Sequence, residues 1–201
     1  MSRKIVAILR GVRPGEVEAI AAAIIDAGIS TIEVPLNSPE PFDSISRIAA
    51  AFGREALVGA GTVLAPEQAE QVHAAGGRLI VSPNCDPSVI ARTLELGMVS
   101  MPGVFTATEC FAAIAAGATG LKLFPAGQAG TGALKALRAV LPADMPVYAV
   151  GGAGPANFAE WIAAGAQGFG IGTALYAPGD SAETVAARAR DMVAALKAAI
   201  K

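Results

Sequence analysis

A lysine lies at the centre of an apolar, strand-length run in the stretch Gly120-Leu121-Lys122-Leu123-Phe124-Pro125. A continuous apolar run of this length is typical of a parallel β-strand covered on both faces, so Lys122 is expected to be buried. Burial without a partner disfavours the ammonium form and lowers the pKa of a lysine. A neutral lysine can attack a carbonyl carbon. The alternative is a lysine that extends from the strand end into a salt bridge.

The same unit repeats along the chain: a short β-rich run, a loop, and an alanine-rich helical segment that ends near a glycine. The expected strands are residues 5–10, 31–36, 57–61, 79–82, 98–101, 120–124, 147–150 and 168–172. Eight strands that alternate with helices predict a parallel sheet, and eight is the number that closes a (β/α)8 TIM barrel. We therefore predict an α/β protein with this fold.

The length of 201 residues suits one compact domain, residues 1–201, although it is the small end for a TIM barrel. An open doubly wound sheet is the main alternative, and a solenoid fits less well because the repeats share no side-chain consensus. Helix starts are marked by Ser38 with Pro39, by the capping-box pattern of Thr106 and Glu109, and by Pro155.

Composition restricts the possible functions. Hydrophobic residues make up 53% of the chain and charged residues 16%, which predicts a large buried core. The net charge is −2 and no basic run is present, so nucleic acid is not an expected partner. Every apolar stretch is interrupted before the roughly 18 residues of a membrane span, and the N-terminus lacks the features of a signal peptide. Two cysteines and one histidine indicate no disulfide framework and no metal site, which fits a cytoplasmic protein.

Three charged residues lie within otherwise apolar strands: Arg10, Glu33 and Lys122. In a TIM barrel the chemistry occurs at the C-terminal ends of the strands, so these side chains are candidates for one active site. Alternatively, Arg10 is an exposed cation, and Glu33 with Lys122 is a buried ion pair, which is weak evidence for stability. Burial and Arg10 would lower the pKa of Lys122, whereas ionised Glu33 would raise it. Three such residues at one end of the barrel favour catalysis.

Two glycine-rich turns follow the last two expected strands. Gly151 and Gly152 follow the seventh, and Gly172 with Thr173 follows the eighth. Glycines allow open turns whose N–H groups converge on an anion, and the dipole of a following helix would add to this effect. The loops after strands seven and eight are the usual phosphate site of the TIM barrel. The alternative is that tight turns simply need glycine.

Four motifs carry a resemblance to a known family: Glu33-Val34-Pro35-Leu36-Asn37-Ser38-Pro39, Gly59-Ala60-Gly61-Thr62-Val63-Leu64, Leu121-Lys122-Leu123-Phe124-Pro125 and Val150-Gly151-Gly152. In this order and over nearly the whole chain, they resemble the class I aldolases that cleave 2-keto-3-deoxy-6-phospho sugar acids. The likeness is nearer to the galactonate branch. The gluconate branch typically has Leu-Arg-Thr in place of Leu36-Asn37-Ser38, and Thr-Gly-Gly in place of Val150-Gly151-Gly152.

The resemblance implies a role for each matching residue. Lys122 matches the Schiff-base lysine and Glu33 the general acid/base. Arg10 and Thr62 match residues around the pyruvate portion of the substrate, although Arg10 could instead serve other substrate oxygens. The phosphate site matches Gly151, Gly152, Gly172 and Thr173, with threonine where the family is expected to have serine. The other expected substrate-binding residues are Pro83, Phe124 and Val150.

The resemblance further implies a homotrimer and a reaction without a cofactor. The expected substrate is a phosphorylated keto-deoxy sugar acid, and the expected products are pyruvate and glyceraldehyde 3-phosphate. Within the family, the alternative is a phosphogluconate aldolase, which differs in the C4 epimer that it prefers. A second alternative is a phosphate-binding barrel isomerase or synthase that uses Lys122 only as an electrostatic clamp. A ligand-binding barrel without catalysis fits less well, because a passive binder need not carry buried charges.

Overall fold

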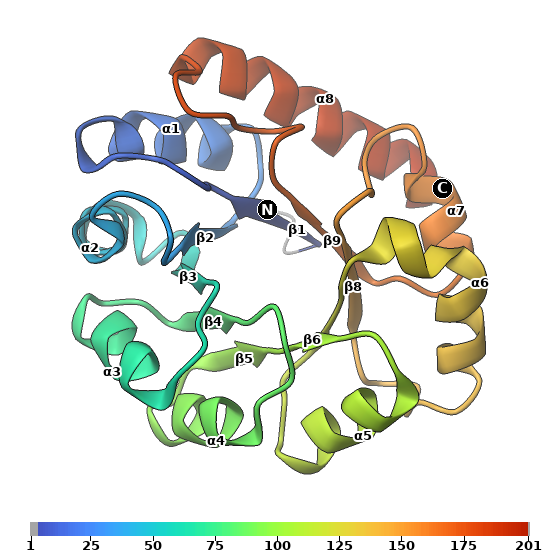
Figure 1. Ribbon diagram of the computed structural model, residues 1–201. Coiled ribbons are helices and arrows are strands. Elements are labelled where there is room, and N and C mark those ends of the chain that lie inside the picture. Colours follow the sequence, from blue (N-terminus) through green and yellow to red (C-terminus); the bar gives the residue numbers. More distant parts are fainter. Residues whose placement is uncertain (1–3, 201) are drawn as a thin grey trace.

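The computed structural model describes residues 4–200 and shows a ring of parallel strands surrounded by helices (Figure 1). The described residues form nine strands: β1 (Ile5–Ile8), β2 (Thr31–Pro35), β3 (Leu57–Gly61), β4 (Leu79–Val81), β5 (Val99–Met101), β6 (Gly103–Val104), β7 (Leu121–Leu123), β8 (Val147–Val150) and β9 (Gly168–Ile171). They also form eight helices: α1 (Pro14–Asp26), α2 (Pro41–Phe52), α3 (Pro66–Ala74), α4 (Pro87–Glu95), α5 (Ala107–Ala115), α6 (Ala126–Arg138), α7 (Phe158–Ala163) and α8 (Ala182–Ile200).

The ring closes through a strand that is broken at Pro102. The order of the sheet is β5-β4-β3-β2-β1-β9-β8-β7-β6, and every pairing is parallel. β5 pairs with β4, β6 pairs with β7, and the carbonyl of Pro102 between them accepts a hydrogen bond from Lys122 N at 2.9 Å. Together β5 and β6 act as the fifth strand of a (β/α)8 barrel. The fold prediction is confirmed, and the open sheet is excluded.

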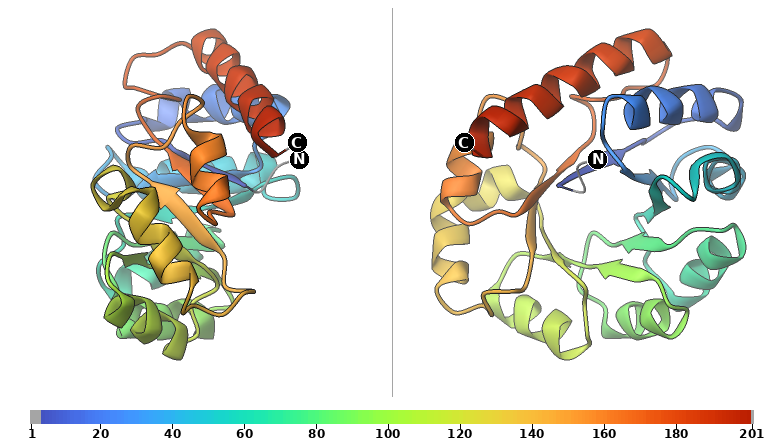
Figure 2. Two further views of the ribbon diagram at one scale, coloured as in Figure 1. Left: turned by 90° about the vertical axis from the view of Figure 1, so that its right-hand side faces the viewer. Right: turned by 180° about the vertical axis from the view of Figure 1, so that it is seen from behind.

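The helices form an outer layer around the strands of the barrel (Figure 2). α8 packs against α1 and α7, so the last helix completes the outer ring beside the first. Within residues 4–200, no helix is both long and apolar enough to span a membrane. The expected domain of residues 1–201 includes residues 1–3 and 201, which lie outside the described residues.

The helix starts were predicted with mixed success. The capping box is confirmed: Thr106 Oγ1 accepts from Glu109 N at 3.3 Å, and the Glu109 carboxylate accepts from Thr106 N at 2.7 Å. The prediction for Ser38 was wrong, because α2 begins only at Pro41. Ser38 Oγ instead accepts a hydrogen bond from Gly11 N at 2.9 Å, which ties the loop after β2 to the loop after β1. α7 likewise begins at Phe158 rather than near Pro155.

The interior of the barrel contains an apolar layer next to the buried charged residues Glu33 and Lys122. Val6, Leu79, Val81 and Met101 form a buried apolar cluster, and Tyr148 packs against it. A small cavity of about 10 Å³ connects members of this layer to Ile8, Glu33, Lys122 and Val150. The two buried charges therefore rest on an apolar layer, which keeps their carboxylate and ammonium groups away from water.

Candidate active site

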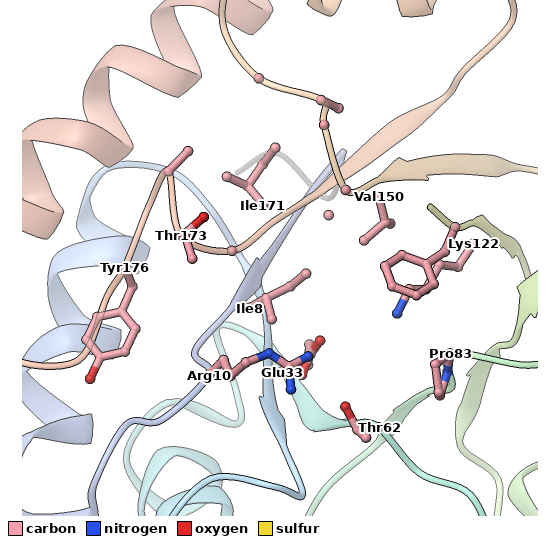
Figure 3. Close-up of a pocket in the computed structure, with 18 of the residues that line it drawn as sticks. Ile8, Arg10, Glu33, Thr62, Pro83, Lys122, Val150, Ile171, Thr173 and Tyr176 are labelled. Atoms are coloured by element: carbon pink, nitrogen blue, oxygen red, sulfur yellow. The ribbon is translucent and has the colours of Figure 1, made fainter. Parts of the chain in front are cut away.

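A pocket of about 670 Å³ opens over the strand ends, and all of the predicted site residues line it (Figure 3). The sequence-predicted residues along its walls are Arg10, Glu33, Thr62, Pro83, Lys122, Phe124, Val150, Gly151, Gly152, Gly172 and Thr173. They come from loops and strands that lie up to 163 positions apart between Arg10 and Thr173. The fold brings these residues together as the sequence predicted, while their chemical roles remain predictions.

Lys122 is buried in β7, with a residue exposure of 6%. Its Nζ lies 4.6 Å from the centroid of the Phe124 ring, where a cation is attracted to the ring face. Burial lowers the pKa of Lys122, Glu33 acts in the opposite direction, and Arg10 lowers the pKa further. The sequence left this balance open, and in the structure burial outweighs Glu33. Lys122 takes part in none of the ion pairs found within residues 4–200, unlike a strand-end lysine that reaches a salt bridge.

Glu33 is more deeply buried than the lysine, with an exposure of 2%. Burial raises its pKa from 4.5 to about 7, although Lys122, Arg10 and the backbone of Gly61 each lower it. Its Oε2 has no hydrogen-bond partner within the described part of the chain. The carboxylate occupies space that only a glycine leaves free, because a Cβ on Gly61 would collide with it. A carboxyl group whose pKa is near 7 can both accept and return a proton at neutral pH.

Arg10 and Thr62 line the pocket near Glu33, in the part that we call its charged end (Figure 3). Arg10 is exposed, and its guanidinium donates a hydrogen bond to Asn37 Oδ1. Thr62 directly follows β3 with φ at 58°, a left-handed conformation that is rare for a β-branched residue. Backbone strain of this kind concentrates at functional sites, where surrounding contacts hold the residue in place.

The opposite end of the pocket is formed by two turns. φ is 82° at Gly151 and 93° at Gly152, and a Cβ on Gly152 would lie 2.9 Å from Gly127 Cα. The backbone N–H groups of Gly152, Ala153, Thr173 and Ala174 donate no hydrogen bond to any atom within residues 4–200. Free N–H groups in adjacent turns are suited to binding an anion such as phosphate.

The expected contribution of helix dipoles is not found. After Gly152 the chain makes a loop before α7 begins at Phe158, and after Thr173 it continues to Ala182 before α8 begins. Because the effect of a helix dipole falls off within its first turn, an anion at this end would meet the N–H groups of the turns and no helix terminus.

A family model described as "KDPG and KHG aldolase" matches residues 1–187 of the chain. The chain belongs to this family. It is 50% identical to the "Probable 2-dehydro-3-deoxy-6-phosphogalactonate aldolase" of Rhizobium meliloti (strain 1021), over 98% of this chain and 93% of that protein. It is 48% identical to the 2-dehydro-3-deoxy-6-phosphogalactonate aldolase of Escherichia coli (strain K12), over 98% of this chain and 96% of that protein.

A solved structure agrees with the sequence relatives. The structure described as "Native KDPGal structure" superposes with a TM-score of 0.96 at 48% identity, and the match covers 98% of this chain and 95% of that one. Membership of the KDPG and KHG aldolase family and the barrel fold are thus established independently of the reasoning from single residues.

The sequence analysis did not predict two polar residues that line the pocket, Asn157 and Tyr176. Asn157 lines the pocket and holds the turn after β8 through its side-chain amide. Tyr176 is buried, and its hydroxyl donates to Glu16 Oε1 at 2.9 Å. Asn157 gave a usable signal, because an asparagine shortly after glycines often bonds to nearby backbone. Tyr176 gave none, since its partner lies 160 residues away. The apolar side chains of Ile8 and Ile171 were also not foreseen.

Proposed function

We propose that the chain is a class I aldolase that cleaves 2-dehydro-3-deoxy-6-phosphogalactonate to pyruvate and glyceraldehyde 3-phosphate. The observation that carries this proposal is the placement of buried Lys122, with its lowered pKa, in one pocket with Glu33. The free N–H groups of the two turns support a phosphorylated substrate. The names of two relatives that cover nearly the whole chain support the galactonate substrate.

The reaction begins at Lys122. The neutral amine attacks the C2 ketone, and loss of water from the resulting carbinolamine gives an iminium on Nζ. The iminium can accept the electron pair of a neighbouring carbon–carbon bond, which the ketone does far less readily. The raised proportion of neutral Lys122 contributes directly to the rate of this step, because an unperturbed lysine is almost entirely protonated at pH 7.

Glu33 then moves the protons. Its carboxylate, directly or through a water, takes the proton of the C4 hydroxyl. The C3–C4 bond breaks, its electron pair forms the enamine, and glyceraldehyde 3-phosphate leaves. Protonation of the enamine at C3 and hydrolysis of the iminium release pyruvate and the free lysine. A pKa of about 7 suits Glu33 to this exchange of protons.

The gluco epimer of the substrate is the second candidate. The side chain next to the phosphate turns is Val150, which cannot hydrogen-bond a C4 hydroxyl. An apolar wall distinguishes two epimers only weakly, by about 1–3 kcal/mol. We therefore expect preference for the galacto substrate together with some turnover of the gluco substrate.

Reductive trapping tests the proposal. The protein is incubated with pyruvate and borohydride, and its peptides are mapped by mass spectrometry. The iminium should be reduced to a stable adduct on Lys122. A protein that turns over a phosphorylated substrate but yields no adduct would use Lys122 as an electrostatic clamp, as an isomerase or synthase would. Binding without turnover or adduct would indicate a ligand-binding barrel.

We further propose that the protein is a homotrimer that acts in the cytoplasm. Four exposed large apolar side chains lie between the end of β3 and α5: Leu64, Leu94, Phe105 and Phe111. An interface between copies of the chain would remove these apolar side chains from water. Light scattering should give the trimer mass, and Phe105→Glu or Phe111→Glu should lower it. A phosphorylated sugar acid does not cross a membrane unaided, so the enzyme is expected in the compartment where its substrate is phosphorylated, which we propose is the cytoplasm; cell fractionation checks this location.

A further inference from the structure

The turn after β8 contains no side chain of its own that could fix its shape. It consists of Gly151-Gly152-Ala153-Gly154, and its first two glycines have positive φ angles. Glycine populates many backbone conformations, so contacts from outside the turn must fix the direction of its N–H groups.

Asn157 supplies two such contacts. Its Nδ2 donates to the carbonyl of Gly152 at 2.9 Å, and its Oδ1 accepts from the N–H of Gly154 at 2.9 Å. One side chain therefore holds the turn on both sides of Ala153. A separate backbone contact, from Gly127 N to the carbonyl of Gly151 at 2.7 Å, holds the preceding peptide.

The side chain of Asn157 does this instead of capping a helix. Asn157 directly precedes α7, where asparagine commonly accepts a hydrogen bond from the helix backbone. Here it makes no such bond and folds back onto the turn. Stabilisation of α7 by its side chain is therefore not the reason for this residue.

The planar geometry of the peptide bond fixes the direction of each free N–H once the neighbouring carbonyl is held. A carbonyl and the following N–H belong to one planar trans peptide, in which they point in opposite directions. Because Asn157 holds the carbonyl of Gly152, the N–H of Ala153 points away from Asn157. By the same rule, the N–H of Gly152 points away from Gly127. Both N–H groups lack a partner within residues 4–200, and both residues line the pocket.

We propose that Asn157 is a positioning residue that aims the N–H of Ala153 at the phosphate of the substrate. This inference rests on the proposed function, which supplies the phosphorylated substrate. Asn157 takes no part in bond cleavage, so its loss should weaken phosphate binding and leave the chemical step intact. A purely structural residue would affect phosphorylated and dephosphorylated substrates alike.

The test uses Asn157→Leu, which keeps the size and removes both hydrogen bonds, and Asn157→Asp, which retains only the bond from Gly154 N. The affinity for inorganic phosphate is measured by calorimetry, and KM and kcat are measured with the phosphorylated substrate and its dephosphorylated analogue.

We expect about tenfold weaker phosphate binding and about tenfold higher KM for the phosphorylated substrate, the size of one charge-assisted hydrogen bond. We expect unchanged kcat, and unchanged kcat/KM for the analogue. Asn84→Leu is the matched control, since Asn84 follows β4 outside the pocket and should change none of these values.

Unchanged phosphate affinity, or equal losses with both substrates, would overturn the inference. Should neither variant fold, amide NMR of the wild type decides: phosphate should shift the N–H signal of Ala153, and an unmoved signal would overturn the proposal. Failure of the proposed function looks different, because the wild type would then form no adduct with pyruvate and borohydride. The phosphate measurements do not depend on that reaction.

Discussion

The two ends of the pocket are built by different means. At the charged end, Lys122 and Glu33 project from strands β7 and β2, and both side chains are buried (Figure 3). At the other end, which we propose binds phosphate and call the phosphate end, the turns at 151–157 and 172–176 contain no charged residue, and they offer backbone N–H groups instead. Changes of side-chain chemistry should therefore impair catalysis at the charged end, whereas an added side chain should impair substrate binding at the phosphate end.

Lys122→Ala should produce the largest effect, because it removes the proposed nucleophile. We expect no covalent capture of pyruvate and a loss of several orders of magnitude in turnover. The measurements are borohydride trapping with peptide mapping and steady-state kinetics. Lys135→Ala is the control, since Lys135 is an exposed lysine on α6. Capture that persists in Lys122→Ala at another lysine would contradict the assignment.

Glu33→Gln keeps the shape of the side chain and removes the proposed base. The iminium should still form, while cleavage should slow by about 10²–10⁴-fold, the usual contribution of general acid–base catalysis. Proton exchange at the methyl group of pyruvate, followed by NMR in D2O, should slow as well. Near wild-type cleavage and exchange would exclude Glu33 from proton transfer.

The same variant should change how stability depends on pH. The pKa of Glu33 is raised in the folded protein from 4.5 to about 7, so the folded state holds this proton more tightly than the unfolded state. Its stabilising contribution is complete below pH 4.5 and is lost as the pH rises through 7. At 1.36 kcal/mol per pKa unit, the loss is about 3 kcal/mol.

Urea unfolding at pH 5 and pH 8 measures this contribution. The wild type should lose more stability than Glu33→Gln between the two pH values, and the difference should approach about 3 kcal/mol. The lowered pKa of Lys122 acts in the opposite direction at higher pH. Because Glu33 raises the pKa of Lys122, its replacement lowers that pKa further and adds to the difference between the two proteins. Identical pH profiles would mean that burial does not raise the pKa of Glu33.

Gly152→Asp tests the phosphate end by adding a side chain and a negative charge. KM for the phosphorylated substrate should rise by about a hundredfold, because like charges brought together cost several kcal/mol and each 1.4 kcal/mol is tenfold. KM for the dephosphorylated analogue should rise far less. Gly152→Ala separates strain from charge, since any Cβ at this position approaches Gly127. Gly132→Asp places the same charge on α6, where a Cβ meets nothing within 4 Å. Equal effects on both substrates would mean that Gly152 serves only the shape of the turn.

The contrast between the two ends also explains what could be predicted from sequence. A charged residue in an apolar strand is conspicuous because its burial is costly, and this identified Glu33 and Lys122. A turn that offers only backbone N–H groups is marked in the sequence by its glycines alone. Gly151 and Gly152 were therefore predicted, whereas Asn157, the hydrogen-bond partner of Gly152, was not. Contacts between distant parts of the chain, such as that of Tyr176 with Glu16, leave no local pattern.

The fold was predicted for similar reasons. Glycines that follow helices and apolar runs that form strands both indicate local structure. The repetition of these two patterns was enough to predict the barrel. The fifth strand was expected to end at Met101, whereas β6 continues it beyond Pro102. Proline lacks the N–H that a sheet ladder needs, yet the pairing of β6 with β7 restores the strand, and this tertiary contact is invisible in the sequence. Ser38 was misread because its partner Gly11 lies on another loop.

Val150 stands between the two ends of the pocket, and its substitution should have the smallest effect. It is buried at the end of β8, directly before Gly151, and its methyl groups fill the space beside Gly170. A threonine has the same shape and can hydrogen-bond a substrate hydroxyl, which valine cannot do. Val150→Thr should therefore shift the ratio of kcat/KM toward the gluco epimer by about tenfold, the size of one good hydrogen bond. The measurement is kcat/KM for both epimers in both proteins, with Val140→Thr on an exposed valine as the control. An unchanged ratio would show that Val150 does not face the C4 hydroxyl, and a wild type that prefers the gluco epimer would overturn the choice of substrate itself.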